Sequence, residues 1–380
     1  MSRQRLRDLG FRVGTMPTGK YNAITDVKGI SVSHVTLVSD DPVAIRTGVT
    51  VIQPVADEVW KSHLAAGFHR FNGGGEMTGT LWVEEAGMLT SPICLTSVWS
   101  VGIVRDTLLR YPILRRNYPD RILRPMVAET NDSILNHGVY QAVTPDHVIE
   151  ALETTKQGPV AEGAVGSGTG MMAFEFKSGI GTSSRLAATP VGEFTIGVLV
   201  QANFGARDEF RIDGVPIGRE IDYDQVPSPR RRKAPAGSII IIVATDAPLL
   251  PTQCNRLAQR AAIGLGRVGG IGHNLSGDLT LAFATGNRFP NPPEVAMLLS
   301  DYKPEQDIGL YQGIEILAHR HLTPLFQGVV EATEEAIINS LTMAHTMTGV
   351  QGRTVHALPL DRVAEIMKMY GHAPTPGIAR

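Results

Sequence analysis

One stretch of the sequence decides how this chain folds and reacts: Gly237-Ser238-Ile239-Ile240-Ile241-Ile242-Val243-Ala244-Thr245-Asp246. Its apolar run is typical of a buried strand, and a basic loop broken by prolines leads into it. If the Gly237–Ser238 bond breaks, Ser238 carries a hydroxyl and a free α-amine on one residue. An α-amine has a pKa of about 7.7–8.0, so near neutral pH part of it can take the hydroxyl proton. No distant histidine is then needed.

The same residues also have an ordinary interpretation. A Gly-Ser pair before an apolar run is a common way for a chain to leave a loop and enter a buried strand. The junction alone therefore leaves self-cleavage and a plain strand entry both open, and the other segments of the chain have to distinguish them.

The charge balance argues against nucleic-acid and membrane partners. The 380 residues include 35 Lys and Arg and 37 Asp and Glu, a net charge of −2, without the field that a polyanion or an anionic membrane requires. The N-terminus has no apolar secretion segment, and the most apolar stretch, residues 239–244, is too short to span a bilayer. We therefore expect a soluble, cytoplasmic protein. With Cys94 and Cys254 alone, we expect packed thiols and neither a disulfide framework nor a thiolate metal cage.

Strand-like runs and helical stretches are mixed along the chain. The runs occupy residues 29–34, 48–52, 194–201, 239–244 and 278–283, and helical periodicity occurs at residues 98–111, 145–154, 252–263, 331–348 and 360–370. Because the two kinds do not strictly alternate, we expect an α/β (α+β) fold of two packed sheets flanked by helices rather than a doubly wound parallel sheet. Glycine clusters inside apolar segments indicate close approach of backbone to backbone or ligand.

Residues 207–236 differ from the rest of the chain. They contain several prolines, many charges and no periodicity, and they include the basic run Arg230-Arg231-Arg232-Lys233. We interpret this segment as a surface linker. An exposed connection just before Ser238 would let the products of a cut separate without disturbing a sheet.

Three further side chains are candidates for chemistry. Ser276 and Asp278 are two apart, so in an extended segment both would lie on one face, where a hydroxyl beside a carboxylate can pass or orient a proton. Asn203 follows a strand-like run, and an amide there can donate to an oxyanion. Taken singly, these residues are equally typical of an Asp-capped turn and of a strand-to-turn asparagine.

Taken together, these segments resemble the L-aminopeptidase/D-esterase and β-aminopeptidase family, self-processing serine hydrolases also called DmpA-like. The resemblance runs nearly end to end and is carried by the Gly237-Ser238 junction and by residues 21–29 (YNAITDVKG), 72–79 (NGGGEMTG), 165–171 (VGSGTGM), 177–185 (KSGIGTSSR) and 347–349 (MTG). It implies a single domain over residues 1–380 with a layered α-β-β-α sandwich, in which two sheets are flanked by helices as in ornithine acetyltransferases.

The resemblance also implies a set of site residues. The precursor would cut itself between Gly237 and Ser238 into associated fragments 1–237 and 238–380, with Ser238 as the nucleophile. Ser276 and Asp278 match the family's Ser-x-acid pattern, and Asn203 matches its oxyanion asparagine. In β-peptide-cleaving members the acid is glutamate, so Asp278 is one methylene shorter. A family tyrosine near the oxyanion aligns with Ile134, and we count neither Ile134 nor the nearby Tyr140 among the catalytic residues.

An aminopeptidase must hold the cationic amine of its substrate, and a carboxylate is the natural partner. We expect Asp278 in this role, with Glu129 and Glu76 as weaker candidates. The predicted activity is release of one N-terminal residue from short peptides, amides or esters through an acyl-enzyme, without a cofactor or metal. Homo-oligomers of the cleaved unit are implied by the family alone.

Two other functions remain as alternatives. An ornithine acetyltransferase-like enzyme would have threonine where this chain has Ser238. A nucleotide-binding module would explain the glycines of residues 166–170, but they lack both the P-loop ending and the dinucleotide spacing. The histidine pairs at 63/69 and 319/321 lack a zinc-site spacing and are interpreted as surface or capping residues.

Overall fold

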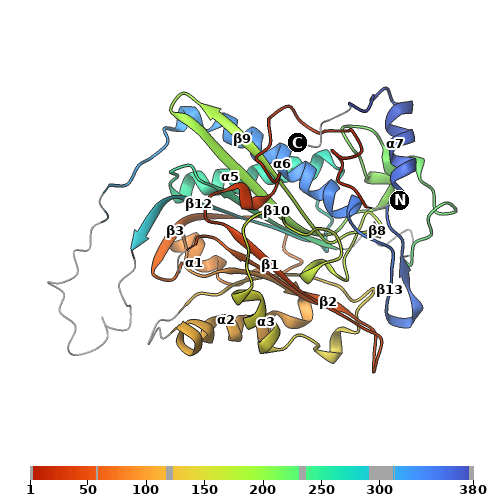
Figure 1. Cartoon of the computed structure of the whole chain (residues 1–380), viewed down its shortest axis with the longest axis horizontal. Coiled ribbons are helices and arrows are strands. Elements are labelled where there is room, and N and C mark those ends of the chain that lie inside the picture. The colour runs from red at the N-terminus through yellow and green to blue at the C-terminus, as the bar shows by residue number, and fades with distance from the viewer. Residues whose placement is uncertain are drawn as a thin grey trace.

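The computed structural model describes residues 3–56, 59–116, 123–230, 237–290, 311 and 313–375. Two β-sheets lie face to face in the middle of the molecule, with helices on the outer face of each (Figure 1). The expected α/β sandwich of two packed sheets flanked by helices is confirmed. Within the described ranges, no helix combines the length and the apolarity that crossing a bilayer requires.

The larger sheet has six strands in the order β4-β3-β12-β11-β10-β9. Its central strand β11 pairs in parallel with β12 and antiparallel with β10, while β12 pairs antiparallel with β3. The six strands are β3 (Ser62–Arg70), β4 (Met88–Leu89), β9 (Ile180–Thr189), β10 (Gly192–Asn203), β11 (Ser238–Thr245) and β12 (Gly277–Pro290).

The smaller sheet has four strands in the order β1-β2-β5-β6. They are β1 (Ser31–Ser39), β2 (Ile45–Gln53), β5 (Ile93–Ser97) and β6 (Met126–Thr130). Two short hairpins stand apart from both sheets: β7 (Met172–Ala173) with β8 (Phe176–Lys177), and β13 (Met347–Thr348) with β14 (Thr354–Val355).

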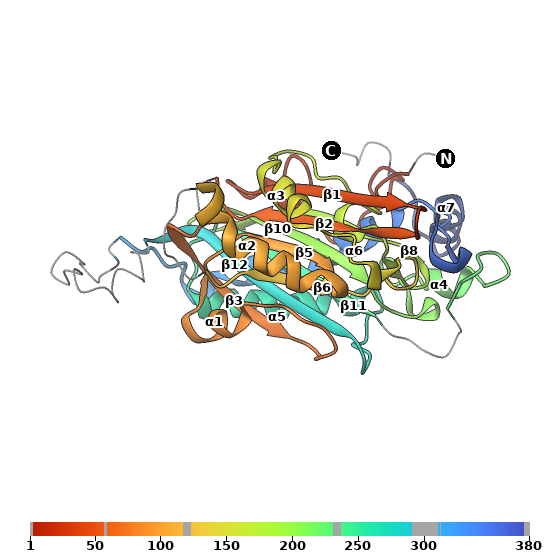
Figure 2. The ribbon, with the colours of Figure 1, turned by 90° about the horizontal axis from the view of Figure 1, so that it is seen from below.

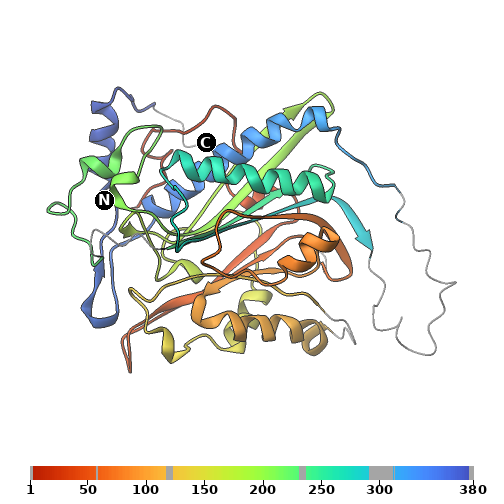
Figure 3. The same ribbon diagram turned by 180° about the vertical axis from the view of Figure 1, so that it is seen from behind.

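Four helices form the outer layers. Helices α2 and α3 cover the four-stranded sheet (Figure 2), and α5 and α6 lie side by side on the six-stranded sheet (Figure 3). The helices are α1 (Thr80–Ala86), α2 (Val101–Arg116), α3 (Pro145–Glu153), α4 (Ile217–Glu220), α5 (Pro251–Arg267), α6 (Thr323–Thr342) and α7 (Leu360–Met369). Short 3₁₀ helices occur at Ile24–Asp26, Val98–Ser100, Gly138–Tyr140, Gly166–Gly168, Arg207–Glu209, His319–His321 and Val350–Gly352.

The uninterrupted apolar run of β11 follows from burial on both faces. Ile239, Ile241 and Val243 belong to the core between the sheet and helices α5 and α6. Ile240 and Ile242 belong to the core between the two sheets. Because successive side chains of a strand point to opposite faces, Ser238 shares the face of Ile240 and lies at the edge of the inter-sheet layer.

The prediction of a helix over residues 331–348 is wrong at both ends. Helix α6 begins at Thr323, with a proline in its first turn, and ends at Thr342. Proline is well tolerated at that position, where its missing N–H has no partner to lose. Met347 and Thr348 are extended and pair with β14, because tertiary contacts override the helical periodicity that continues past the end of the helix.

The interpretation of residues 207–236 as a surface linker is also wrong for their described part. Arg207, Phe210, Ile212 and Ile217 are buried, and Phe210 stacks on Phe174. Scattered apolar side chains anchor this segment to the core, although they show no periodicity. Residues 231–236 lie outside the described residues.

Burial of the two cysteines is as predicted: both thiols are free and fully buried. Burial raises the pKa of Cys94 to about 12 and also raises that of Cys254. By contrast, His63, interpreted from the sequence as a surface or capping residue, is buried within β3.

Candidate active site

Ser238 is the first residue of β11 and lies between two neighbouring strands. Its Cα is paired with Asn203 at the end of β10 and with Gly277 at the start of β12. The Gly277 N–H donates a hydrogen bond to Ser238 Oγ at 3.1 Å, and only 6% of Ser238 is exposed. The sheet register therefore brings three of the predicted regions to one point.

Gly237 is pressed against the end of β10. A Cβ atom at this position would lie 2.0 Å from the carbonyl oxygen of Asn203 and 2.8 Å from the Cα of Phe204. Both neighbours are backbone atoms at the end of β10, so they cannot easily move aside. The close approach explains why glycine precedes Ser238.

Ser276 and Asp278 meet on the other side of Ser238. The Ser276 hydroxyl donates to Asp278 Oδ1 at 2.6 Å, and both side chains are buried. Asn72 holds the same carboxylate, because its Nδ2 donates to Asp278 Oδ2 at 2.7 Å and its Oδ1 accepts the Asp278 N–H at 2.6 Å. Burial raises the pKa of Asp278, against the opposing effect of the hydrogen bonds from Ser276 and Asn72.

Asn72 is the site residue that sequence reasoning missed. Its signal was the cluster Asn72-Gly73-Gly74-Gly75-Glu76, which was noted only as a shared motif. Gly74 donates its N–H to the Ser276 carbonyl at 2.8 Å, and a Cβ at Gly75 would lie 2.9 Å from the Cα of Gly277. The glycines let this loop touch the backbone that carries Ser276 and Asp278.

The Asn203 side chain has a fixed orientation. Its Oδ1 accepts the Met172 N–H at 3.0 Å, and its Nδ2 donates to the Asn131 carbonyl at 3.0 Å. An amide nitrogen has two donors, so a second N–H of Nδ2 remains beyond the bond to Asn131. Asn203 is the register partner of Ser238, which puts that donor at the same end of the sheet.

Glu129 and Glu76 occupy different environments. Glu129, on β6, is 4% exposed, and its Oε1 accepts the Glu76 N–H at 2.9 Å, whereas the Glu76 residue itself is exposed. The pKa of Glu129 is raised to about 7, mainly by burial and also by the nearby charges of Glu76 and Asp132, against the lowering effect of the hydrogen bond from the Glu76 N–H. Glu129 also borders Gly75, whose Cβ would lie 3.3 Å from Oε1.

The other positions discussed from the sequence lie in less reactive settings. Ile134 packs against the small buried cluster of Leu135, Met172 and Val355, and Tyr140 is 50% exposed. The glycine-rich residues 166–170 are fully buried or nearly so, and added Cβ atoms there would collide with neighbouring atoms. Close packing accounts for these glycines without a nucleotide.

The comparisons with known proteins agree on one peptidase family. The model of peptidase family S58 matches residues 22–355. The beta-peptidyl aminopeptidase BapA of Sphingosinicella microcystinivorans is 41% identical over 382 residues, covering 96% of this chain and 92% of that protein.

Solved structures agree with this assignment. A β-aminopeptidase of Burkholderia sp. is 44% identical with a TM-score of 0.88, and the match covers 98% of this chain and all of that one. The L-aminopeptidase D-Ala-esterase/amidase of Ochrobactrum anthropi, described as a variant of the Ntn hydrolase fold, is 37% identical with a TM-score of 0.86, covering 97% and 99% of the two chains. This chain therefore belongs to peptidase family S58 and is a hydrolase of the aminopeptidase class.

Proposed function

We propose that this chain is a self-processing serine aminopeptidase that cuts itself between Gly237 and Ser238. Fragment 238–380 would then begin with Ser238, which takes up the N-terminal residue of a short peptide, amide or ester as an acyl-enzyme. The observation that carries the proposal is the position of Ser238. It is the first residue of a central strand, and its Cα is paired with Asn203 at the end of β10 and with Gly277, the residue between the hydrogen-bonded Ser276 and Asp278.

In the precursor, Ser238 Oγ would attack the carbonyl carbon of Gly237. The C–N bond breaks, a C–O bond forms, and the nitrogen takes a proton to become the α-amine of Ser238. Water then hydrolyses the ester and leaves a carboxylate on Gly237. The absence of a side chain at Gly237 leaves the carbonyl unhindered and allows its contact with Asn203.

After the cut, the α-amine of Ser238 is the proposed base. Its pKa of about 7.7–8.0 leaves part of it neutral at pH 7, so it can accept the hydroxyl proton and later return it to the leaving amine. The Ser276 hydroxyl proton is committed to Asp278. The lone pairs of Ser276 Oγ are therefore available to accept from the ammonium, and the Asp278 carboxylate stabilises its charge.

Two donors are proposed for the oxyanion. The second N–H of Asn203 Nδ2 and the N–H of Gly277, which contacts Ser238 Oγ at 3.1 Å, belong to adjacent strands. Because both come from a rigid sheet, they need little reorganisation as charge develops. One such donor contributes about 10²–10³ to the rate of acyl transfer.

The substrate's ammonium group needs a carboxylate beside the reacting centre. Asp278 is one candidate, although its two oxygens already accept from Ser276 and Asn72. Glu129 is buried next to Gly75, and a cation would favour its charged form. We therefore assign amine recognition to Glu129 together with Asp278, which raises the rank of Glu129 among the sequence candidates.

We also propose a homo-oligomer of the cleaved unit acting in the cytoplasm. Large apolar side chains are exposed in two 3₁₀ helices. Trp99, just before α2, is 43% exposed, and Val139 and Tyr140, in Gly138–Tyr140, are 70% and 50% exposed. Such exposure is typical of interfaces. Light scattering on the purified protein measures the assembly, and cell fractionation measures the location.

The proposal is tested by intact-mass analysis and by turnover. Wild-type protein should yield two masses that meet at Gly237/Ser238, and it should hydrolyse amides of α- or β-amino acids. Since the similar proteins include β-peptidyl aminopeptidases, β-amino acid amides belong in the first substrate panel. Ser238→Ala should remain a single chain of 40.9 kDa without activity.

Ser340→Ala is the matched control for Ser238→Ala. Ser340 is also a buried serine, but it lies on α6 and bonds to the Ile337 carbonyl. This variant should cleave itself and turn over substrate normally. A Ser238→Ala chain that still splits in two would disprove the assignment.

A further inference from the structure

The hairpin of β7 and β8 lies against the end of β10, beside the proposed oxyanion amide. The Met172 N–H donates to Asn203 Oδ1 at 3.0 Å, and the Phe174 N–H donates to the Phe204 carbonyl at 2.7 Å. The turn between the strands has φ angles of +48° at Phe174 and +64° at Glu175. Residues other than glycine rarely adopt this left-handed conformation, so the surroundings must hold the hairpin in place.

Lys177 is the last residue of β8, and its side chain contacts the residues just before and just after this hairpin. Its side chain is fully buried, and Nζ donates to the Met171 carbonyl at 2.9 Å and to the Ser178 carbonyl at 2.6 Å. Among the described residues no carboxylate forms an ion pair with it. A buried amine without a counter-ion is costly, and burial lowers the pKa of Lys177 to about 7.

Two hydrogen bonds on either side of one peptide group indicate the role of Lys177. The Met171 carbonyl that accepts from Lys177 and the Met172 N–H that donates to Asn203 belong to one planar peptide group. Fixing the oxygen of that group fixes the direction of its N–H. The direction of the N–H in turn sets the plane of the Asn203 amide. A donor at the oxygen also polarises the peptide and strengthens the hydrogen bond made by its N–H.

A second contact supports the same segment from β6. The Thr130 hydroxyl lies 2.9 Å from the sulfur of Met171, and Thr130 itself accepts from Gln201 Nε2 at 2.7 Å. A sulfur is a weak acceptor, so this contact places the Met171 side chain rather than its peptide group. The Met171 carbonyl accepts from Lys177 Nζ at 2.9 Å and from the backbone N–H of Ser178 at 3.2 Å. Among the side-chain contacts described here, the one to this carbonyl comes from Lys177.

We propose that Lys177 is a positioning residue for the oxyanion donor Asn203, acting through the Met171–Met172 peptide group. The inference rests on the proposed function, because it needs Asn203 to stabilise the transition state. Lys177 itself touches neither substrate nor Ser238. Its removal should therefore lower kcat through misplacement of the Asn203 amide and leave substrate binding nearly intact.

The first test is Lys177→Met, which keeps the unbranched side chain as far as Cε and removes the donor group. We expect kcat to fall by about 10–100-fold, since a misplacement of about 1 Å can cost that much, with KM within about threefold of wild type. Turnover is expressed per molecule with a free Ser238, counted by intact mass. The rate of self-cleavage in cell-free translation should fall in parallel, because it uses the same oxyanion contacts.

Gln253→Met is the matched control for lost stability. Gln253 is also fully buried and bonds to two backbone groups, the Leu250 N–H at 2.9 Å and the Leu317 carbonyl at 2.8 Å, but it lies on α5. Both variants should lose thermal stability, and only Lys177→Met should lose kcat. Equal kcat in the two variants would overturn the proposal.

A double-mutant cycle with Asn203→Ala separates the two hypotheses. Asn203→Ala alone should lower kcat by about 10²–10³, and adding Lys177→Met should change it by less than about threefold, because the amide to be positioned is gone. If Asn203→Ala leaves kcat unchanged, the proposed oxyanion role of Asn203 fails. If Asn203→Ala is slow but the effects of the two changes multiply, Lys177 acts elsewhere and the present inference fails. Should Lys177→Met not fold, Lys177→Gln, which keeps an N–H donor on a shorter chain, takes its place in the same cycle.

Discussion

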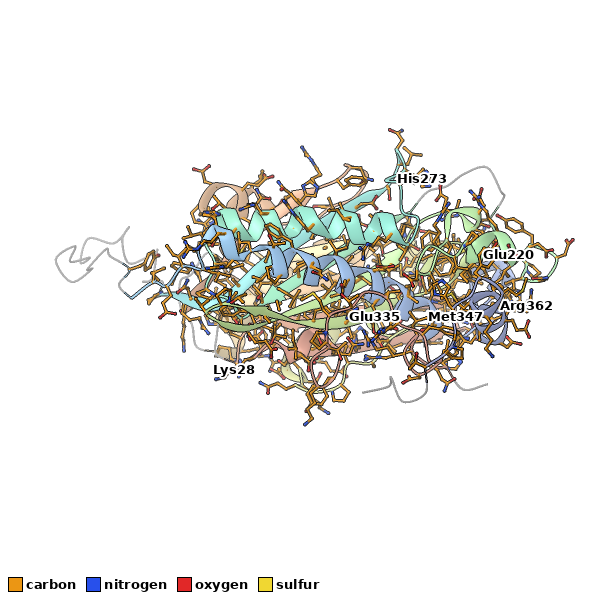
Figure 4. All side chains as sticks on the ribbon, turned by 90° about the horizontal axis from the view of Figure 1, so that it is seen from above. Lys28, Glu220, His273, Glu335, Met347 and Arg362 are labelled. Carbon is orange, nitrogen blue, oxygen red and sulfur yellow. The ribbon has the colours of Figure 1, made fainter. Side chains whose placement is uncertain are left out.

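Replacing Glu335 by alanine should destabilise this protein by about 3–5 kcal/mol, the cost of removing one partner from a buried ion pair. Glu335 lies on α6 (Figure 4), and its carboxylate accepts two hydrogen bonds from Arg7 at 2.7 and 2.9 Å, one from Asn22 at 2.5 Å and one from Arg185 at 2.7 Å. The side chains of Glu335 and Arg185 are fully shielded from solvent. The three donors precede the proposed cut and Glu335 follows it, so this cluster joins the two fragments.

The effect should depend on pH in a defined direction. Burial alone disfavours the charged form, but Arg185 and Arg7 outweigh it, so the pKa of Glu335 is lowered. A carboxyl with a lowered folded-state pKa contributes its full stability above its unfolded pKa of about 4.3 and loses it as the pH falls through the folded value. The difference between wild type and Glu335→Ala should therefore be constant above about pH 5 and shrink below about pH 4.

Scanning calorimetry of the mature protein measures the effect. With an unfolding entropy of about 2.1 cal/mol/K per residue, 3–5 kcal/mol corresponds to a Tm lower by about 4–6 °C. Glu334→Ala is the control on the same helix: its partner Arg267, at 3.1 Å, is 47% exposed, and such pairs contribute about 1 kcal/mol or less. Equal losses of Tm in the two variants would refute the reasoning.

Three further outcomes are expected. Gly237→Ala should accumulate as an uncut chain on a denaturing gel, because its Cβ would lie 2.0 Å from the Asn203 oxygen; normal cleavage would contradict the proposed geometry. Asp278→Asn should keep its hydrogen-bonded shape and lose charge, and kcat for an amide should fall by about 10²–10⁴; an unchanged kcat would exclude Asp278 from proton handling. Burial raises the pKa of Glu129 to about 7, so its charge is lost below that pH. KM for cationic substrates should then rise by up to about tenfold per unit as the pH falls below about 7, and Glu129→Gln should abolish this dependence in a steady-state pH series.

Local sequence patterns were sufficient to predict the central strand and most of the helices. The apolar run after Ser238 has only one stable setting, a strand covered on both faces, and it occupies that setting as β11. The spacing of Ser276 and Asp278 likewise predicted their meeting, because two residues of one extended segment share a face.

What depends on distant pairing was not predictable. Asn72 lies 206 positions from Asp278 and reaches it only because β3 and β12 are neighbours in the sheet. No local periodicity records that pairing. The packing of Arg207 and Phe210 was missed for the same reason, since charge and proline content describe a segment's composition but not the aromatic surface it meets.

The strand order of the six-stranded sheet has a consequence for the proposed two-fragment enzyme. β11 and β12, which follow Ser238, are inserted between β3 on one side and β10 on the other, and both of these precede it. The two halves could therefore come apart only by opening two ladders of the central sheet, which amounts to global unfolding. Dilution alone should not abolish the enzymatic activity. Fragments 1–237 and 238–380 made in separate cells should not assemble into an active enzyme. On the proposed cut, each working molecule has to descend from one continuous polypeptide that folded before the cleavage.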